Sequence, residues 1–393
     1  MKTRQSLNHL FLLLALALCS LSAAANQTLT FGFEETIKST ILNEERLIYV
    51  SLPNGYETNT STRYPVLYTL DGKTHFKRVV GTVEWLSVSA NMIPRHIVVA
   101  ITNVNRFRDF TPTKPKNSGE RPAGGADKFL GFIGDELIPY IDKKYRTTAF
   151  RTLTGHSLGG LLTIHTLLTR PTMFRSYVAM SPFVRFDDGE IVNRAAKVLK
   201  SSSELNASFF MTLGDEPTLL PAYQKLERIL NKQAPKGLEW ESHVYELETH
   251  MSTPSKTLHN ALVSISLYAG WQLSPEVVAK GIDAIRAHYV KLSVQMGAPV
   301  KPPEGSMNTL GYRLLGEKKI EESIKVFTYN TELYPQSTNP YDSLADALEA
   351  AGKLAEAKAT LEEAVKIATT NKARNLAQLQ GHLKDVTMKL TNL

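Results

Sequence analysis

The stretch that decides the fold is RTLTGHSLGGLLTIHTLLT, residues 151–169. It places a G-x-S-x-G motif between a strand-like segment and a helical one. This context predicts a nucleophile elbow, in which Ser157 sits on a strained turn between strand and helix. Gly155 and Gly159 are expected to let the two backbones approach closely, because they carry no side chains. An ordinary glycine-serine turn is the alternative, and it leaves the flanking strand and helix unexplained.

Short apolar runs alternate with helical segments on both sides of this elbow. The predicted strands are residues 66–70, 97–101, 152–154, 177–180, 209–213 and 244–247. Strands that alternate with helices indicate βαβ units and a mostly parallel sheet, so the predicted fold class is α/β, of the α/β-hydrolase type. Residues 35–52 alternate apolar and polar side chains, which predicts antiparallel strands at the edge of that sheet.

A serine hydroxyl becomes a good nucleophile only when a neighbouring base removes its proton. In this fold the partners follow in the order serine, acid, histidine. His250 stands just past the last predicted strand, where a loop can hold it over the sheet, and it is the preferred base. The other histidines after the elbow lie inside predicted helices, as His165 does, or inside a strand, as His243 does.

The third member of such a triad is a carboxylate on the loop after the preceding strand. The strand at 209–213 runs into Gly214-Asp215-Glu216, so two adjacent acids compete for the role. We prefer Glu216 because it lies farther out on the loop. Asp215 stays open as the acid, and its alternative role is to cap the following helix.

Backbone N–H groups are expected to bind the oxyanion that forms during acyl transfer. One donor in this architecture is the residue after the nucleophile, here Leu158. The second comes from the loop after an early strand, and the Lys73 amide fits because Asp71-Gly72 turns directly after the strand at 66–70. The alternative for Asp71-Gly72 is an ordinary turn.

Several function classes are not supported by the sequence. The histidines and acids show no H-E-x-x-H spacing, and there is no P-loop or dinucleotide fingerprint, so we expect no metal and no cofactor. The net charge of +7 is spread without a long Lys/Arg run, which argues against nucleic-acid binding.

The first 25 residues have the pattern of a signal peptide. Lys2 and Arg4 form a basic start, residues 10–19 are apolar, and residues 23–25 are alanines. This pattern predicts export to the periplasm or outside the cell, with cleavage after Ala25. Ten apolar residues fall short of the roughly 20 that a spanning helix needs, so we expect no membrane span.

The chain from about residue 306 has a helical pattern with an internal repeat. Apolar and small positions recur 34 residues apart, as in Leu310 and Leu344 or Phe327 and Leu361. This period is typical of tetratricopeptide repeats. The predicted division is therefore a signal peptide (1–25), a hydrolase domain (26–298), a linker (299–305) and a tetratricopeptide-like all-α domain (306–393). The tail is either a groove for a protein partner or a helical appendage packed on the hydrolase.

Five segments together resemble one known family. They are YPVLYTLDG (64–72), RDFTP (108–112), ELIPY (136–140), GHSLGG (155–160) and SP (181–182). They look like the "Putative esterase" family, which includes esterase D, feruloyl esterases, siderophore esterases and mycolyltransferases. The resemblance covers about residues 35–270, and it implies an α/β-hydrolase fold and chemistry on a small-molecule carboxylic ester.

These observations predict a serine esterase that works through an acyl-enzyme intermediate. Ser157 would attack the ester, His250 would transfer the proton, and Glu216 would orient the His250 ring. The Leu158 and Lys73 amides would bind the oxyanion. Acyl transfer to an alcohol by the same residues is one alternative. A catalytically silent hydrolase body that presents the helical tail to a partner is the other.

Overall fold

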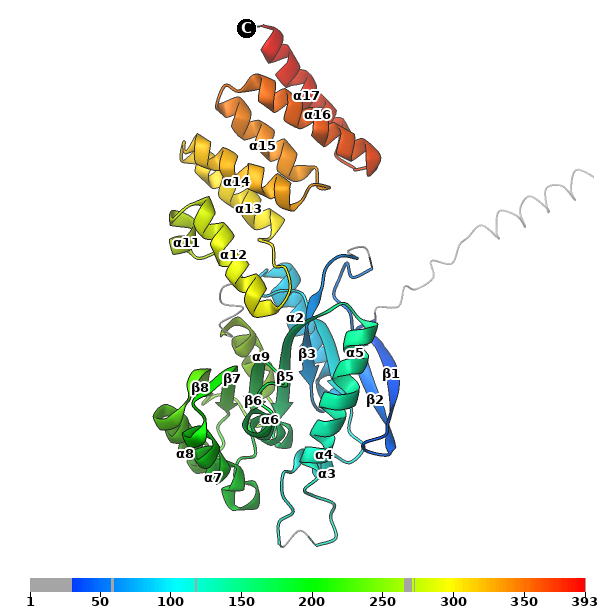
Figure 1. The fold of residues 1–393 in the computed structure, drawn as a ribbon, viewed down its shortest axis with the longest axis vertical. Helices are drawn as coiled ribbons and strands as arrows, with labels where there is room; N and C mark the ends of the chain where they lie inside the picture. Colours follow the sequence, from blue (N-terminus) through cyan, green and yellow to red (C-terminus); the bar gives the residue numbers. More distant parts are fainter. Residues whose placement is uncertain (1–29, 58–59, 117–118, 265–270, 272, 393) are drawn as a thin grey trace, which may run out of the picture.

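The computed structural model describes residues 30–57, 60–116, 119–264, 271 and 273–392 (Figure 1). Within these residues, one eight-stranded sheet has the order β1-β2-β4-β3-β5-β6-β7-β8. Its strands are β1 (Phe33–Ser39), β2 (Glu44–Ser51), β3 (Tyr64–Thr69), β4 (Ile97–Ile101), β5 (Thr147–His156), β6 (Ser176–Met180), β7 (Glu204–Leu213) and β8 (Lys236–Val244). The expected signal peptide, 1–25, lies outside the described residues.

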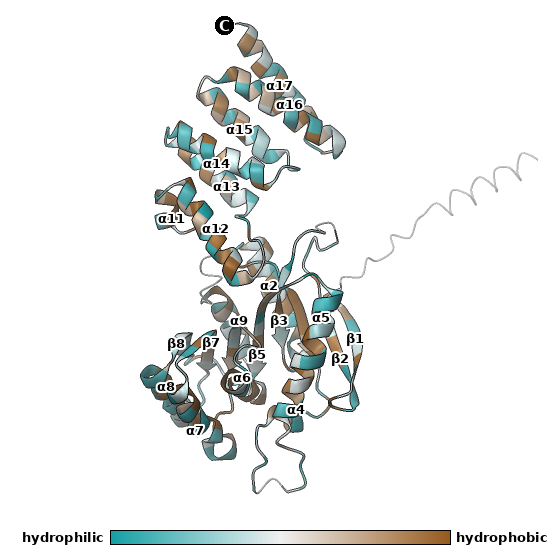
Figure 2. Ribbon diagram, viewed as in Figure 1, coloured by the Kyte–Doolittle hydropathy of each residue, from teal (hydrophilic) through white to brown (hydrophobic). Residues whose placement is uncertain are grey.

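The pairing directions agree with the predicted α/β fold. The β1/β2 and β2/β4 pairs are antiparallel, and every pair from β4 to β8 is parallel. The central strand β3 is buried at all six positions, because helices cover both faces of a parallel sheet. Figure 2 accordingly shows hydrophobic residues in the middle of the sheet, around β3.

Ten helical segments of the described chain lie between or beside the strands. They are α2 (Gly72–Glu84), η1 (Trp85–Ser89), α3 (Arg106–Phe110), α4 (Ala126–Gly131), η2 (Phe132–Leu137), α5 (Ile138–Lys144), α6 (Leu158–Thr169), α7 (Phe186–Ser201), α8 (Leu220–Gln233) and α9 (Thr253–Ser264). The segments η1 and η2 are π-helical turns.

Alternate residues of the central strands face two different hydrophobic clusters. Val66 and Tyr68 join the cluster formed with α4 to α8, whereas Leu67 between them joins the cluster formed with α2 and α9. Successive strand side chains point to opposite faces, so this alternation follows from strand geometry. The two helical layers are thereby fixed on opposite faces of the sheet.

The last strand differs from the prediction of 244–247. The strand β8 ends at Val244, and Leu247 lies in the following loop with 94% of its surface exposed. The strand was misplaced because β8 forms the edge of the sheet, where most positions are exposed and the apolar pattern is weak. The shift leaves His250 in a loop, between β8 and α9.

The chain after residue 273 is helical. Its helices are α11 (Pro275–Ala279), α12 (Ile282–Met296), α13 (Glu304–Gly316), α14 (Ile320–Leu333), α15 (Asn339–Ala350), α16 (Leu354–Thr370) and α17 (Leu376–Thr391). Gly297, with φ 64°, ends α12 in the left-handed conformation that glycine adopts readily. The segment α13–α17 extends away from the sheet in Figure 1. Its assignment to the tetratricopeptide class stays a prediction.

One hydrophobic cluster runs from the sheet into these helices. The helix α12 contributes Ile285, Tyr289, Leu292 and Met296 to the cluster that also holds Leu67, Val98 and Phe150 of the sheet. Met307 and Leu310 of α13 and Val326 of α14 continue the same cluster. A separate cluster holds α15, α16 and α17 together. The helices α12, α13 and α14 therefore share one hydrophobic cluster with the sheet.

No helix in the described part of the chain is both long and apolar enough to cross a membrane.

Candidate active site

Ser157 occupies the turn between β5 and α6. Its φ of 60° and ψ of −117° lie outside the regions that non-glycine residues ordinarily adopt, which is the strain expected of a nucleophile elbow. The surrounding backbone holds this conformation. The Ser157 N–H donates to the Met180 carbonyl at 3.0 Å, and the Ser157 carbonyl accepts from the Leu161 and Phe183 N–H groups, each at 3.0 Å.

Two glycines allow this close approach, and one of them differs from the prediction. A Cβ atom on Gly155 would lie 2.2 Å from the Gly159 carbonyl oxygen, so Gly155 is required where strand and helix meet. A Cβ on Gly159 would make only ordinary contact, 3.4 Å from Asp71 Oδ2. The second tight position is Gly160, where a Cβ would lie 2.9 Å from Pro182 Cα.

The structure brings His250 and Glu216 together. Nδ1 of His250 lies 2.5 Å from Oε2 of Glu216, and the other carboxylate oxygen accepts from the Gly214 N–H at 3.2 Å. Asp215 is exposed, and its backbone N–H donates to the Glu248 carbonyl at 2.7 Å. Asp215 does not cap the next helix either, because the N-cap of α8 is Leu219 and has no side-chain cap.

His156, the residue before Ser157, holds the loop that carries His250. Its Nε2 lies 2.8 Å from the His250 carbonyl oxygen, and the two ring centroids are 4.5 Å apart. A carbonyl oxygen only accepts hydrogen bonds, so Nε2 of His156 carries the proton. Burial, with the nearby His250 and His75 rings, lowers the pKa of His156 to about 3, which keeps this ring neutral.

The histidines set aside in the sequence analysis serve other purposes. His165 is buried in α6, where its Nε2 lies 2.7 Å from Asp127 Oδ1 and its Nδ1 accepts from Arg194 at 2.9 Å. His243 is exposed on the edge strand β8. Neither histidine contacts Ser157 or Glu216 through a bond that the structure records.

The two predicted oxyanion donors lie in the first turns of neighbouring helices. Leu158 is the first residue of α6, and Lys73 is the second residue of α2. Amide N–H groups in a first helical turn have no acceptor within their own helix, and the helix dipole favours negative charge there. The start of α6 lies against the start of α2, since Gly159 is in contact range of Asp71.

An ion pair that the sequence analysis missed holds the start of α2. Asp71 is buried with φ 54° at the N-cap position of α2, and its carboxylate accepts two hydrogen bonds from Arg106, from Nε at 2.6 Å and from Nη2 at 2.9 Å. Asn103 donates to the same carboxylate at 2.5 Å. Nη2 of Arg106 also donates to the His156 carbonyl at 3.1 Å, so the guanidinium joins the oxyanion loop to the elbow.

A cluster of ion pairs fixes the segment that carries Arg106. Arg46 is fully buried in β2 and donates to Asp109 of α3 at 2.6 Å. Arg108 bonds both Asp109, at 2.7 Å, and Glu44, at 2.6 Å. The RDFTP segment is the available signal in the sequence, but partners more than 60 residues away cannot be inferred from it.

A family profile described as "Putative esterase" matches residues 39–245. These residues include β2 to β8, the elbow and Glu216. The chain belongs to this esterase family. It has the α/β-hydrolase fold of that family and is an ester hydrolase that acts on small-molecule esters.

This esterase is similar to proteins that act on siderophores. The ferri-bacillibactin esterase BesA of Bacillus subtilis is 28% identical over 252 residues, 56% of this chain and 85% of the relative. A siderophore triacetylfusarinine C esterase of Aspergillus fumigatus is 30% identical over 185 residues, 44% of this chain and 63% of the relative. The crystal structure of an IroE-like serine hydrolase from Shewanella oneidensis superposes with TM-score 0.65 at 26% identity, covering 77% of this chain and 99% of the other.

Exposed apolar side chains flank the site of the esterase. Leu247 and Met251, on either side of His250 in sequence, are 94% and 69% exposed. Val104, next to Asn103 of the ion-pair network, is 57% exposed. Lys73 is also exposed, and Arg106 keeps 34% of its side-chain surface exposed. The segments that carry the proposed site residues therefore include both apolar and cationic exposed side chains.

Proposed function

We propose that this protein is a serine esterase that cleaves a siderophore ester through an acyl-enzyme intermediate on Ser157. The proposal rests on the 2.5 Å contact between His250 and Glu216, taken together with the strained elbow conformation of Ser157. A carboxylate on Nδ1 fixes the tautomer in which Nε2 can accept the serine proton. It also stabilises the imidazolium that forms.

The reaction has two balanced steps. Ser157 Oγ bonds to the acyl carbon while His250 takes its proton, and the ester C–O bond breaks as His250 returns that proton to the leaving alcohol. Water then attacks the acyl-enzyme, with its proton passing through His250 back to Ser157, and the carboxylic acid is released. The product pair is one acid and one alcohol.

The oxyanion of each tetrahedral intermediate would lie between the Leu158 and Lys73 N–H groups. A donor of this kind is typically worth about 10²–10³ in rate. We propose that the ion pair between Arg106 and Asp71 holds the starts of α2 and α6 in fixed positions relative to each other. This assignment is supported by the bond from Arg106 to the His156 carbonyl.

The substrate assignment is supported by the two siderophore esterases to which the chain is similar. The apolar rim at Leu247, Met251 and Val104 suits the organic shell of such a molecule. The exposed Lys73 and the partly exposed Arg106 suit an anionic iron complex.

The test uses purified full-length protein, its Ser157→Ala variant, and three substrates. These are 4-nitrophenyl butyrate, an iron-loaded catecholate trilactone and an iron-loaded hydroxamate triester. We expect the wild type to cleave at least one siderophore with kcat/KM at least tenfold above that for the butyrate. Ser157→Ala should be inactive on all three and should lose labelling by a fluorophosphonate probe.

Two other results identify the rival functions. Transfer of the acyl group to an added alcohol, in excess over hydrolysis, would make the protein an acyltransferase. A wild type that neither turns over nor takes up the probe would be a silent hydrolase body that presents its helical tail.

We further propose that the chain is exported and cleaved after Ala25, as the pattern of residues 10–25 indicates. We also keep the division into a hydrolase domain (26–298) and a helical domain (306–393) as a proposal. Amino-terminal sequencing of protein from the periplasm and medium of an expressing bacterium tests the first point. Truncation, described below, tests the second.

A further inference from the structure

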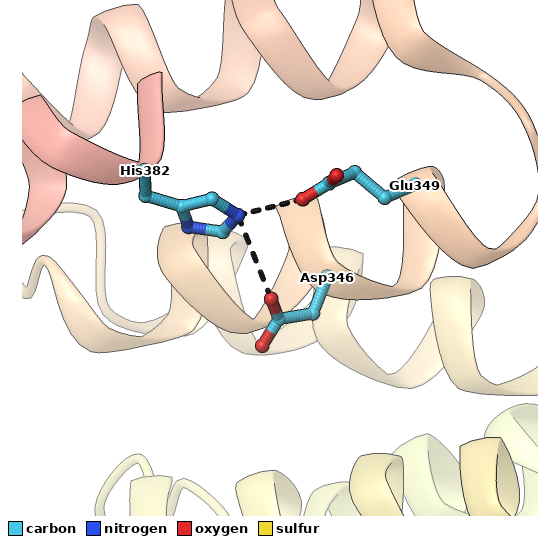
Figure 3. Close-up of side chains that lie close together, drawn as sticks. All are labelled: Asp346, Glu349 and His382. Carbon is cyan, nitrogen blue, oxygen red and sulfur yellow. Dashed lines mark hydrogen bonds and ion pairs between the residues drawn. The ribbon is translucent and has the colours of Figure 1, made fainter. Parts of the chain in front are cut away.

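Two helices of the tail bring a histidine and two carboxylates together, far from the elbow in sequence. His382 projects from α17 toward Asp346 and Glu349 of α15 (Figure 3). Nε2 of His382 lies 2.6 Å from Glu349 Oε1 and 3.6 Å from Asp346 Oδ1. The three atoms all lie within 4.8 Å of one another. The two acids are three positions apart on one helix, so they share a face.

Each of these side chains is held from behind by a further residue. Nδ1 of His382 lies 2.7 Å from Asp342 Oδ1. Tyr312 donates to the second oxygen of Asp346 at 2.7 Å, and Lys389 donates to the second oxygen of Glu349 at 2.6 Å. Metal-binding histidines characteristically donate their other ring N–H to a carboxylate, and metal-binding carboxylates are hydrogen-bonded in turn. The outer contacts here have that arrangement.

The cluster carries more negative than positive charge when the imidazole is neutral. Among the described residues, the ion pairs of Asp342, Asp346 and Glu349 include one cation besides His382, the Lys389 ammonium. A cation placed between Asp346, Glu349 and His382 would offset this excess.

We propose that His382, Glu349 and Asp346 bind one divalent transition-metal ion, with Zn²⁺ as the best fit. One imidazole nitrogen with two carboxylate oxygens is a donor set that zinc accepts, and water would complete the tetrahedron. Zinc–ligand bonds of about 2.0–2.2 Å put the ligand atoms of a tetrahedral site roughly 3.3 Å apart. The 3.6 Å pair therefore needs little change, and the 2.6 Å pair must lengthen by less than an ångström.

A bound ion would clamp the last helix of the chain. Its ligands come from α15 and α17, and it would add to the polar contacts between these helices and to the packing of α17 on α16. Metal binding to preformed ligands of the folded state adds to folding stability. We therefore expect the ion to stabilise the tail and to leave ester hydrolysis unchanged.

A proton is the competitor for this position. Nδ1 of His382 faces Asp342 and Nε2 faces Glu349, each within hydrogen-bond distance, so a doubly protonated ring also fits between the two acids. A protonated His382 would bridge the acids by ion pairs alone. The metal and the proton exclude each other on Nε2, because a metal ligand must be unprotonated.

The experiment titrates ZnCl₂ into full-length protein without a polyhistidine tag, stripped with chelator, at pH 8. Calorimetry measures stoichiometry and affinity, and elemental analysis counts bound zinc. We expect one zinc per chain, at least tenfold weaker binding in His382→Gln and in Glu349→Gln, and about tenfold weaker binding in Asp342→Asn, whose effect is indirect. The matched control is His259→Gln, an exposed histidine on α9 that should bind zinc as the wild type does.

Ester hydrolysis and circular dichroism, measured on every variant, separate loss of the site from loss of the fold. The proposal is overturned if the wild type binds no zinc below 1 mM, which would leave an ion-pair network held by a proton. It is equally overturned if His382→Gln binds zinc as tightly as the wild type. Loss of zinc in His250→Gln, with binding kept in His382→Gln, would put the ion in the hydrolase site instead.

Discussion

The imidazole of His156 donates a hydrogen bond to the backbone carbonyl of His250, across 94 residues of sequence. The residue that precedes the proposed nucleophile thus fixes the loop of the proposed base. This contact forms because β5 ends beside the loop between β8 and α9. Only the folded sheet brings these two segments together.

We expect His156→Leu to lower kcat at least tenfold with little change in KM. Without the hydrogen bond, the loop that carries His250 loses a contact that fixes its position, while the substrate surface is untouched. His156→Gln should retain most of the activity, because its amide N–H can reach the same carbonyl. Steady-state kinetics on 4-nitrophenyl butyrate decide the point. Equal losses in both variants would mean that the ring itself is needed, and not its hydrogen bond.

The acid can be identified by comparing two neighbouring variants. Glu216→Gln should lower kcat at least a hundredfold, because the imidazole loses the carboxylate that fixes its tautomer, a loss of about 10⁴ in the serine-protease triad. Asp215→Asn should stay within about tenfold, since its side chain is exposed. Kinetics at pH 7.5 measure both. Similar small effects would indicate that Ser157 and His250 act as a dyad.

We expect the ion pair between Arg106 and Asp71 to affect kcat. Arg106→Met leaves the buried Asp71 carboxylate without its main partner, so α2 should lose its fixed start and kcat should fall at least a hundredfold. Arg106→Lys keeps the charge but not the two-pronged contact, and an intermediate loss is expected. The thermal midpoint is measured alongside kcat. A rate loss that follows the loss of stability in both variants would assign Arg106 a purely structural part.

Truncation tests where the hydrolase domain ends and the helical tail begins. A chain ending at residue 298 keeps α12 and should hydrolyse 4-nitrophenyl butyrate, with a lowered thermal midpoint because Met307, Leu310 and Val326 leave the shared cluster. A chain ending at residue 281 also loses the apolar face of α12. Each buried large side chain contributes about 1.5–3 kcal/mol, so losing four of them approaches the whole stability of a typical domain. We expect insoluble protein, and a soluble, active product would show that α12 belongs to the tail.

Stability should fall on acidification below neutral pH. Burial lowers the pKa of His96 and of His75 to about 4, below the 6.5 of an unfolded histidine. Between these values the unfolded chain binds more protons, so the free energy of unfolding decreases as pH falls through this window. Each such histidine contributes about 2 kcal/mol of loss between pH 6.5 and 4.5.

Urea unfolding at pH 6.5 and 4.5 measures this loss. His96→Gln removes one of the titrating groups, so the variant should lose about 2 kcal/mol less than the wild type over the same interval. An equal loss in both proteins would mean that His96 binds its proton equally well in the folded and the unfolded chain. His259→Gln, on the exposed side of α9, should behave as the wild type does.

Local patterns were enough for the α/β class, the elbow and the helical tail. The strand before Ser157 and the helix after it are visible in sequence because a buried parallel strand and an amphipathic helix have different periods. The edge strand β8 was misplaced because one of its faces meets solvent and its apolar pattern is weak. Local patterns also brought Asp215 and Glu216 to one loop without deciding between them.

The sequence by itself determined which residues could react, since a G-x-S-x-G turn, a late histidine and a pair of acids are chemical types at readable positions. Tertiary structure alone decided which of them meet. Glu216 reaches His250, Arg106 reaches Asp71 and His382 reaches Glu349 because separate strands and helices end side by side. Such contacts join residues far apart in the chain, and packing of the whole fold sets their distances, so no local pattern encodes them.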